Sequence, residues 1–148
     1  MTASIALAVT LAAQGQFGRI TFPTSGPAAA RAPFIRGVAQ LHNFEYDDAI
    51  LSFREAERVA PGFAMAHWGE ALSYSQPLWY NEDVAKGREA LTRLAPDAAA
   101  RSAKAPTPRE KGWLDAVERL FGSGDRASRQ RAYADRMAQL ARDFPDDD

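Results

Sequence analysis

The stretch from Phe34 to Tyr74 constrains the fold more than any other part of the chain, because apolar residues recur in it at helical spacing. Residues three, four and seven positions apart lie on one face of an α-helix, so this recurrence predicts amphipathic helices. The first pattern consists of Phe34, Ile35, Val38, Leu41 and His42. The second consists of Ala49, Ile50, Phe53, Ala56 and Ala60. A third helical pattern follows the break at Pro61 and Gly62.

Small residues indicate how closely the first two helices approach each other. Gly37, Ala49 and Ala56 stand where two antiparallel helices are expected to touch. Phe53 is expected to fill the gap beside them. The stretch therefore predicts a tightly packed helical hairpin followed by another helix.

A linked set of residues in this stretch also carries a resemblance to a known family. The set consists of Gly37, Tyr46, Ala49, Phe53, Ala56 and Pro61. It resembles the tetratricopeptide repeat (TPR), which has a small residue and an aromatic residue in its first helix, Ala and Phe in its second, and a closing Pro. A TPR restarts after about 34 residues, and Ala71 and Tyr74 stand where the next repeat needs its small and aromatic residues. Gln40 departs from the pattern, because it occupies the place of the first repeat's own aromatic residue.

Length and composition limit the classes of protein to consider. The chain has 148 residues, of which 46% are hydrophobic, and this is enough for one domain with a core. Its formal net charge of −1 provides no global field for recruiting nucleic acid or anionic lipid. The absence of cysteine excludes disulfides, thiolate metal sites and a cysteine nucleophile.

The first 33 residues divide into two segments. Residues 1–13 contain an apolar run that is too short to span a bilayer and resembles the apolar part of a secretory signal. Thr10 and Ala12 provide a small-residue cleavage site, although no Lys or Arg precedes Arg19. We expect export to the periplasm or the medium; the alternative is an uncleaved apolar segment on a cytoplasmic protein. Residues 14–33 are rich in Gly, Pro, Ser and Thr and predict an extended leader, with Pro33 in the first turn of the following helix.

The rest of the chain predicts two further helix pairs. Helical patterns occur in residues 63–75 and 83–94. Between them lies the aromatic insertion Gln76–Asn81. We expect this insertion to fold over its own hairpin, because exposing large aromatic rings to water is energetically costly. A connector at 95–108 leads to a fifth helix, where Thr107, Pro108 and Glu110 predict a capping box. A sixth helix ends before Pro145. We therefore expect residues 34–148 to form an all-α, TPR-like α-solenoid of three antiparallel pairs, the N-terminal fragment of a longer array.

Residues capable of chemistry form no recognisable catalytic or metal constellation. His42 and His67 are the only imidazoles, and a metal site would also need carboxylates such as Glu45 or Glu70. Asp47, Asp48, Glu55 and Glu57 are typical of solvated helix faces and helix starts. The arginines of the last helix alternate with acids and also predict a solvated face; they are Arg126, Arg129, Arg131 and Arg136. We expect no enzyme activity, no cofactor, no metal and no nucleic-acid partner.

The resemblance implies that the first helix of each repeat lines a concave groove. Carried onto this chain, the groove residues are Arg31, Phe34, Val38, Leu41, His42, Trp68, Leu72, Ser75 and Gln76. Such an apolar groove suits an amphipathic helix or an extended peptide of a protein partner. The expected function is a non-enzymatic protein-interaction module that also self-associates through its uncapped last repeat. The alternatives are an accessory packing region of a larger enzyme or transport assembly, and a small-ligand or metal-binding protein.

Overall fold

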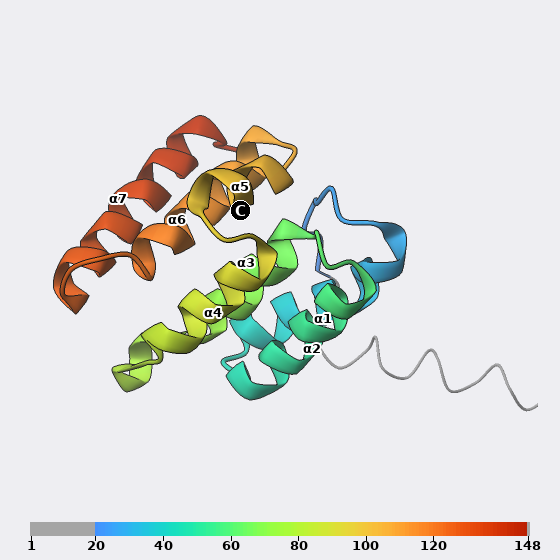
Figure 1. Cartoon of the computed structure of the whole chain (residues 1–148), viewed down its shortest axis with the longest axis horizontal. Helices are drawn as coiled ribbons and strands as arrows, with labels where there is room; N and C mark the ends of the chain where they lie inside the picture. The colour runs from blue at the N-terminus through green and yellow to red at the C-terminus, as the bar shows by residue number, and fades with distance from the viewer. Residues whose placement is uncertain (1–19, 148) are drawn as a thin grey trace, which may run out of the picture.

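The structure, a computed structural model, describes residues 20–147 and is mostly helical there (Figure 1). Its α-helices are α1 (Ala28–His42), α2 (Tyr46–Val59), α3 (Ala64–Ser73), α4 (Val84–Leu94), α5 (Ala98–Lys104), α6 (Pro108–Leu120) and α7 (Arg126–Asp143). The predicted all-α fold is confirmed for this part of the chain. The signal-like segment and the first residues of the predicted leader, 1–19, lie outside the described residues.

The helices pack mainly against their neighbours along the chain. Contacts join α1 to α2, α2 to α3, α3 to α4, and α6 to α7. Helix α3 also touches α1 and α6, so it links the two ends of the described structure. Figure 1 shows α6 and α7 side by side, with α5 beside α6. Among the described residues, no helix is long and apolar enough to cross a membrane.

Helix α1 begins earlier than the sequence suggested. Residues up to Pro33 were expected to stay extended, but the helix starts at Ala28 and contains Pro33 inside it. Ala28, Ala29 and Ala30 have high helix propensity, which favours a start before the proline. Four later helices have the side-chain caps that stabilise helix starts; the capping residues are Asp83, Asp97, Thr107 and Asp125.

A phenylalanine between two glycines sets the spacing of the first three helices. Phe53 of α2 is completely buried. A Cβ atom added at Gly37 of α1 would lie 2.9 Å from Phe53 Cδ1, and one added at Gly69 of α3 would lie closer still. The expected role of Gly37 beside Phe53 is confirmed, and Gly69 plays the same part on the other side of the ring.

The aromatic insertion does not fold over its own hairpin, so this prediction was wrong. It forms two paired strands, β1 (Ser75–Gln76) and β2 (Asn81–Glu82), around the 3₁₀ turn η2 (Pro77–Trp79). Leu78, Trp79 and Tyr80 remain 64%, 58% and 83% exposed. The two-residue strand pairing and the left-handed backbone of Tyr80 (φ 52°) reverse the chain direction within the insertion. The principal backbone contacts of this hairpin are internal or to α3. Trp79 contacts Phe44 and Tyr46 instead, and its ring remains more than half exposed.

The spacing around Phe53 generates a stability prediction. Gly69→Ala is expected to lower the free energy of unfolding by about 1–3 kcal/mol, because the added methyl group overpacks the buried ring. Gly62→Ala is the matched control, since nothing lies within 4 Å of a Cβ atom at that position. Urea unfolding of both variants measures the difference; equal stabilities would contradict the proposed packing constraint.

Candidate functional site

The predicted groove residues do not all lie on one accessible surface. Phe34, Val38, Leu41 and Trp68 are buried, whereas Leu72, Ser75 and Gln76 are half-buried and Arg31 and His42 are exposed. Val38 and Leu41 belong to the main hydrophobic core. The structure brings Phe34 and Trp68 together around a segment of the chain that lies before α1.

That segment, residues 20–27, is the described part of the leader. Its side chains alternate between half-buried and exposed: Ile20, Phe22, Thr24 and Gly26 are half-buried, and Thr21, Pro23, Ser25 and Pro27 are exposed. Such a period of two is the geometry of an extended chain with one side against a surface. The leader therefore lies on the helices as a bound extended peptide would.

Phe22 is the apolar anchor of the leader. Its ring centroid lies 5.4 Å from that of Phe34 in α1, 5.7 Å from that of Trp68 in α3 and 6.1 Å from that of Trp113 in α6. The Arg109 guanidinium lies 4.7 Å from the centroid of the Phe22 ring. Rings at these separations attract one another, and a cation near a ring adds to the attraction. We call the surface made by Phe34, Trp68, Arg109, Glu110 and Trp113 the leader face.

Glu110 is the polar anchor, and it is only 2% exposed. Its carboxylate accepts hydrogen bonds from Thr24 Oγ1 at 2.9 Å, from Ser25 N at 2.7 Å and from Ser25 Oγ at 2.8 Å. Burial by itself would raise the pKa of Glu110, but these hydrogen bonds and one from Thr107 outweigh it and hold the pKa below its usual value. The leader therefore supplies most of the donors that keep this buried carboxylate charged.

The role of Glu110 was only half visible in the sequence. Thr107 caps α6 as predicted, accepting a hydrogen bond from Glu110 N at 3.1 Å. In a capping box the Glu side chain turns back to the backbone N–H of the cap residue. Here the Glu110 carboxylate instead meets the Thr107 hydroxyl and the leader. The signal that could have located this contact is the alternation of Ile20, Phe22 and Thr24, which is typical of one-sided burial.

Arg109 fixes the leader from the same turn of α6. Its Nη1 donates to Pro23 O at 2.8 Å, and its Nε lies 2.6 Å from Asp147 Oδ2. Trp113 Nε1 donates to the same Asp147 oxygen at 3.3 Å. Residues from both ends of the described chain are thus held at the start of α6.

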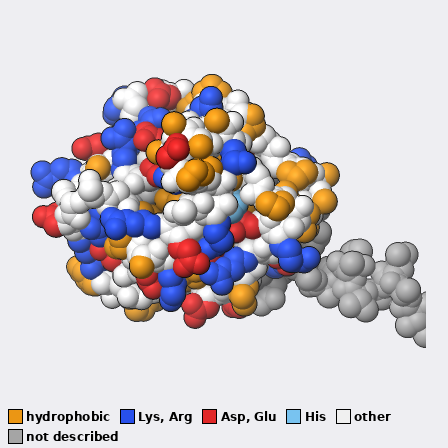
Figure 2. All heavy atoms as spheres, viewed as in Figure 1, with side chains coloured by type: hydrophobic (Ala, Val, Ile, Leu, Met, Phe, Trp, Pro, Cys, Tyr) orange, Lys and Arg blue, Asp and Glu red, His pale blue; other side chains and the backbone are white. Residues whose placement is uncertain are grey.

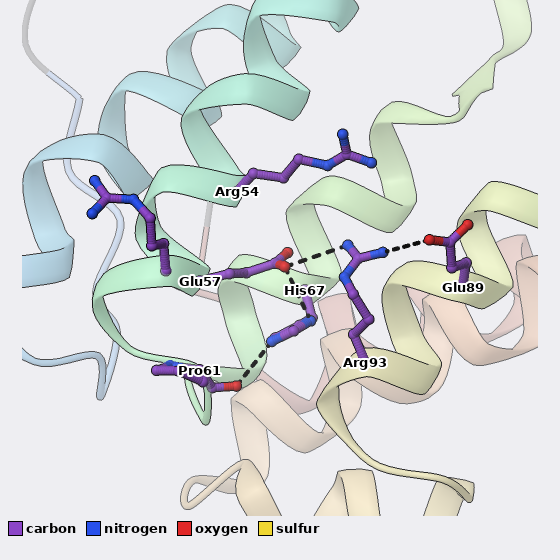
Figure 3. Close-up of a pocket in the computed structure, with 7 residues that line it drawn as sticks. Arg54, Glu57, Pro61, His67, Glu89 and Arg93 are labelled. Atoms are coloured by element: carbon purple, nitrogen blue, oxygen red, sulfur yellow. Dashed lines mark hydrogen bonds and ion pairs between the residues drawn. The ribbon is translucent and has the colours of Figure 1, made fainter.

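A second candidate site, which we call the ionic pocket, has a volume of about 550 Å³ and lies between α2, α3 and α4 (Figure 3). Arg93 of α4 pairs with Glu57 at 3.4 Å, with Glu70 and with Glu89 at 3.4 Å. Arg54 of α2 donates to Glu70 Oε1 at 2.8 Å. Glu70 is completely buried, so these two arginines supply the charge that compensates it.

His67 also belongs to this pocket, and both of its ring nitrogens have protein neighbours. Nδ1 lies 3.0 Å from Ala90 O and Nε2 lies 3.0 Å from Pro61 O. Burial lowers the pKa of His67, although the two carbonyl groups favour the protonated ring. Because both nitrogens are occupied, His67 joins α3 to its neighbours rather than offering a metal ligand. His42 is exposed, and its Nδ1 lies 2.7 Å from Val38 O. The described residues contain no cluster of three potential metal ligands.

Glu57 was expected on a solvated helix face, but this was wrong: it is 8% exposed. Burial, followed by the neighbouring Glu70 carboxyl, raises the pKa of Glu57 to about 8. A pKa of about 8 favours the protonated form of the Glu57 carboxyl at neutral pH. Burial would also raise the pKa of Glu70, but hydrogen bonds with Glu57, Arg54 and Arg93 hold it below its usual value. The sequence does not reveal this pair, because its members come from different helices.

Two surface features bear on the other classes of partner. Arg129, expected on the solvated face of the last helix, is 8% exposed and donates to Leu120 O, Gly124 O and Glu82; that expectation was wrong for this residue. Figure 2 shows Lys and Arg side chains interspersed with Asp and Glu on the visible face. This face has no broad basic area of the kind that binds nucleic acid.

Comparison with protein families, with curated proteins and with solved structures finds no match to this chain. Its function is therefore argued from the two sites themselves. The ionic pocket contains arginine, glutamate and histidine side chains already paired within the protein. The leader face already holds a polypeptide segment.

The protonated Glu57 generates a prediction about pH. A raised folded-state pKa means that the stabilising contribution is full below the unfolded value of about 4.5 and is lost as the pH rises toward about 8. His67, with its lowered pKa, changes stability only below its unfolded value of 6.5, and Tyr74 only above 10. Between about pH 6.5 and 8, Glu57→Gln is therefore expected to remove a decline of up to about 1.4 kcal/mol per pH unit.

Urea unfolding at several pH values measures this decline. Glu89→Gln is the control, because Glu89 lines the same pocket and is exposed. It is expected to keep the slope of the natural chain. A Glu57→Gln variant with that same slope would show that Glu57 is ionised at neutral pH.

Proposed function

We propose that this chain is a non-enzymatic protein-interaction module of the TPR class, and that the leader face binds an extended polypeptide segment. In this proposal α1–α2, α3–α4 and α6–α7 are three like-built helix pairs in series. The leader face crosses the first helix of each pair, through Phe34 of α1, Trp68 of α3 and Trp113 of α6.

The spacing of these aromatic residues supports the proposed repeat. Phe34 and Trp68 stand one repeat length apart, about 34 residues. Trp113 begins the apolar pattern of α6 that matches the pattern beginning at Phe34 in α1. Equivalent positions of successive repeats form a continuous surface in solenoids, which suits an elongated ligand.

The single observation that carries the proposal is the leader itself. Residues 20–26 lie extended across α1, α3 and α6, with Phe22 among three rings and Thr24 and Ser25 on a buried carboxylate. This favours an extended ligand over an amphipathic helix, because alternate side chains of the leader face the protein.

The leader is also suited to being displaced. Phe22 and Thr24 are only half-buried, and no helix or strand includes them. A partner segment with an aromatic residue two positions before a hydroxyl residue has the same two anchors. Since the leader is tethered beside its site, it competes at a high effective concentration, and a partner must overcome this competition.

A labelled peptide with the sequence of residues 20–27 tests the proposal in trans. We expect it to bind the full-length Phe22→Ala variant at least about tenfold more tightly than the natural chain, because the weakened leader competes less. A peptide with Phe22→Ala is expected to lose this binding, and Glu110→Gln in the protein is expected to weaken it. Fluorescence anisotropy measures all of these affinities.

Phe44→Ala is the matched control, because Phe44 is exposed and lies outside the leader face. This protein variant is expected to bind the peptide no better than the natural chain. Failure of the peptide to bind any variant, together with a lower unfolding midpoint for Phe22→Ala, would make the leader a structural strap. The accessory packing role would then be the better explanation.

A further inference from the structure

A second surface, remote in sequence from the leader, gathers exposed aromatic rings. Phe44 lies in the turn between α1 and α2 and is 52% exposed. Trp79 lies in η2, and its ring centroid is 5.9 Å from that of Phe44 and 5.8 Å from that of Tyr46, edge-to-face in both cases. The turn after α1, the first residue of α2 and the insertion after α3 thus bring three rings together, of which Phe44 and Trp79 are exposed and Tyr46 is buried.

These rings line a hollow of about 320 Å³, and its other lining residues are three acids and the amide of Gln76. We call it the aromatic–acidic hollow, formed by Phe44, Glu45, Tyr46, Asp47, Asp48, Gln76 and Trp79. No Lys or Arg lines it. Within residues 20–147, the side chains of Glu45, Asp47 and Asp48 make no ion pair. The acids suit the start of α2, but that role does not require exposed rings beside them.

The loops that expose these side chains have energetically unfavourable backbone conformations. Phe44 and Tyr80 both have left-handed backbones, with φ values of 63° and 52°, and large side chains rarely adopt this conformation. Leu78, Trp79 and Tyr80 of the same insertion are all more than half exposed. Arg126 already lies over the Tyr80 ring at 5.6 Å and donates to Tyr80 O. The insertion therefore already binds one guanidinium, that of Arg126, from the same chain.

We propose that the aromatic–acidic hollow binds an arginine side chain presented by a partner polypeptide. Charge complementarity decides the occupant, because the hollow offers carboxylates and ring faces and no cation of its own. A guanidinium is planar, stacks on aromatic faces and pairs with carboxylates through two parallel hydrogen bonds. The volume of the hollow lies at the lower end of the range of ligand pockets, which is sufficient for one arginine side chain. This site is separate from the leader face and does not depend on it.

The probe is the peptide acetyl-Gly-Arg-Gly-amide, with its citrulline counterpart as the neutral probe of nearly the same shape. We expect the arginine peptide to shift the Trp79 indole N–H resonance of the full-length protein, with a dissociation constant of about 1 mM. The citrulline peptide is expected to cause no saturable shift. Raising the salt concentration is expected to weaken the binding.

Two variants locate the interaction. Asp47→Asn with Asp48→Asn is expected to weaken arginine binding about tenfold, since it removes both charges while leaving the rings in place. Asp135→Asn with Asp146→Asn changes the net charge equally at exposed positions outside the hollow, and it is expected to leave the affinity within about twofold of the natural value.

Three results would overturn the proposal. One is equal binding of the arginine and citrulline peptides, which would show that the positive charge does not contribute to binding. Another is an equal loss of affinity in both double variants, which would show that the peptide responds to the net charge of the protein rather than to the carboxylates of the hollow. The third is the absence of any Trp79 shift at about 20 mM arginine peptide.

Discussion

Helix α3 is enclosed by other helices, and the rest of the structure depends on this enclosure. Nine of its residues are buried, all except Leu72, and it contacts α1, α2, α4 and α6. Most buried polar groups in proteins have hydrogen-bond partners, and among the described side chains of α3 one polar atom, Trp68 Nε1, lacks a partner. Ser73 donates to Gly69 O, His67 meets two backbone carbonyls, and Glu70 is paired with arginines from α2 and α4. The ionic pocket is the result of burying charge inside a helical layer.

The same enclosure explains the shared proton of Glu57 and Glu70. Two carboxyl groups that approach each other in a buried place cannot both ionise without a large electrostatic cost. Arg93 and Arg54 offset the charge of Glu70, and Glu57 retains a proton. The arrangement has the perturbed pKa values often found at functional sites. Here each partner of the pair also joins helices that have to remain in contact, so a structural role accounts for it.

The two proposed binding surfaces differ in the burial of their aromatic side chains. On the leader face, Phe34 and Trp68 are buried and Phe22 completes them with an edge-to-face contact at 71° to Phe34. In the aromatic–acidic hollow, Phe44 and Trp79 remain exposed, although the loops that carry them have strained backbones at Phe44 and Tyr80. Strain of this kind persists only where the surrounding structure imposes it. The hairpin pairing of Ser75 with Glu82 and the contact of Phe44 with Tyr46 provide that support.

The sequence by itself determined the existence of the helices other than α5, the close contact at Gly37 and the Thr107 cap, because hydrophobic periodicity and capping are local properties of the chain. Helix α5 lies in the segment that was predicted to be a connector. The sequence also pointed to Phe34 and Trp68 as residues of one surface. Only the tertiary structure decided that the leader covers that surface, that Glu110 turns toward Thr24 and Ser25, and that Glu57 is buried beside Glu70. It likewise decided that Trp79 meets Phe44 rather than its own hairpin. Each of these contacts joins segments far apart along the chain, and their geometry depends on how the helices stack, which local pattern does not encode.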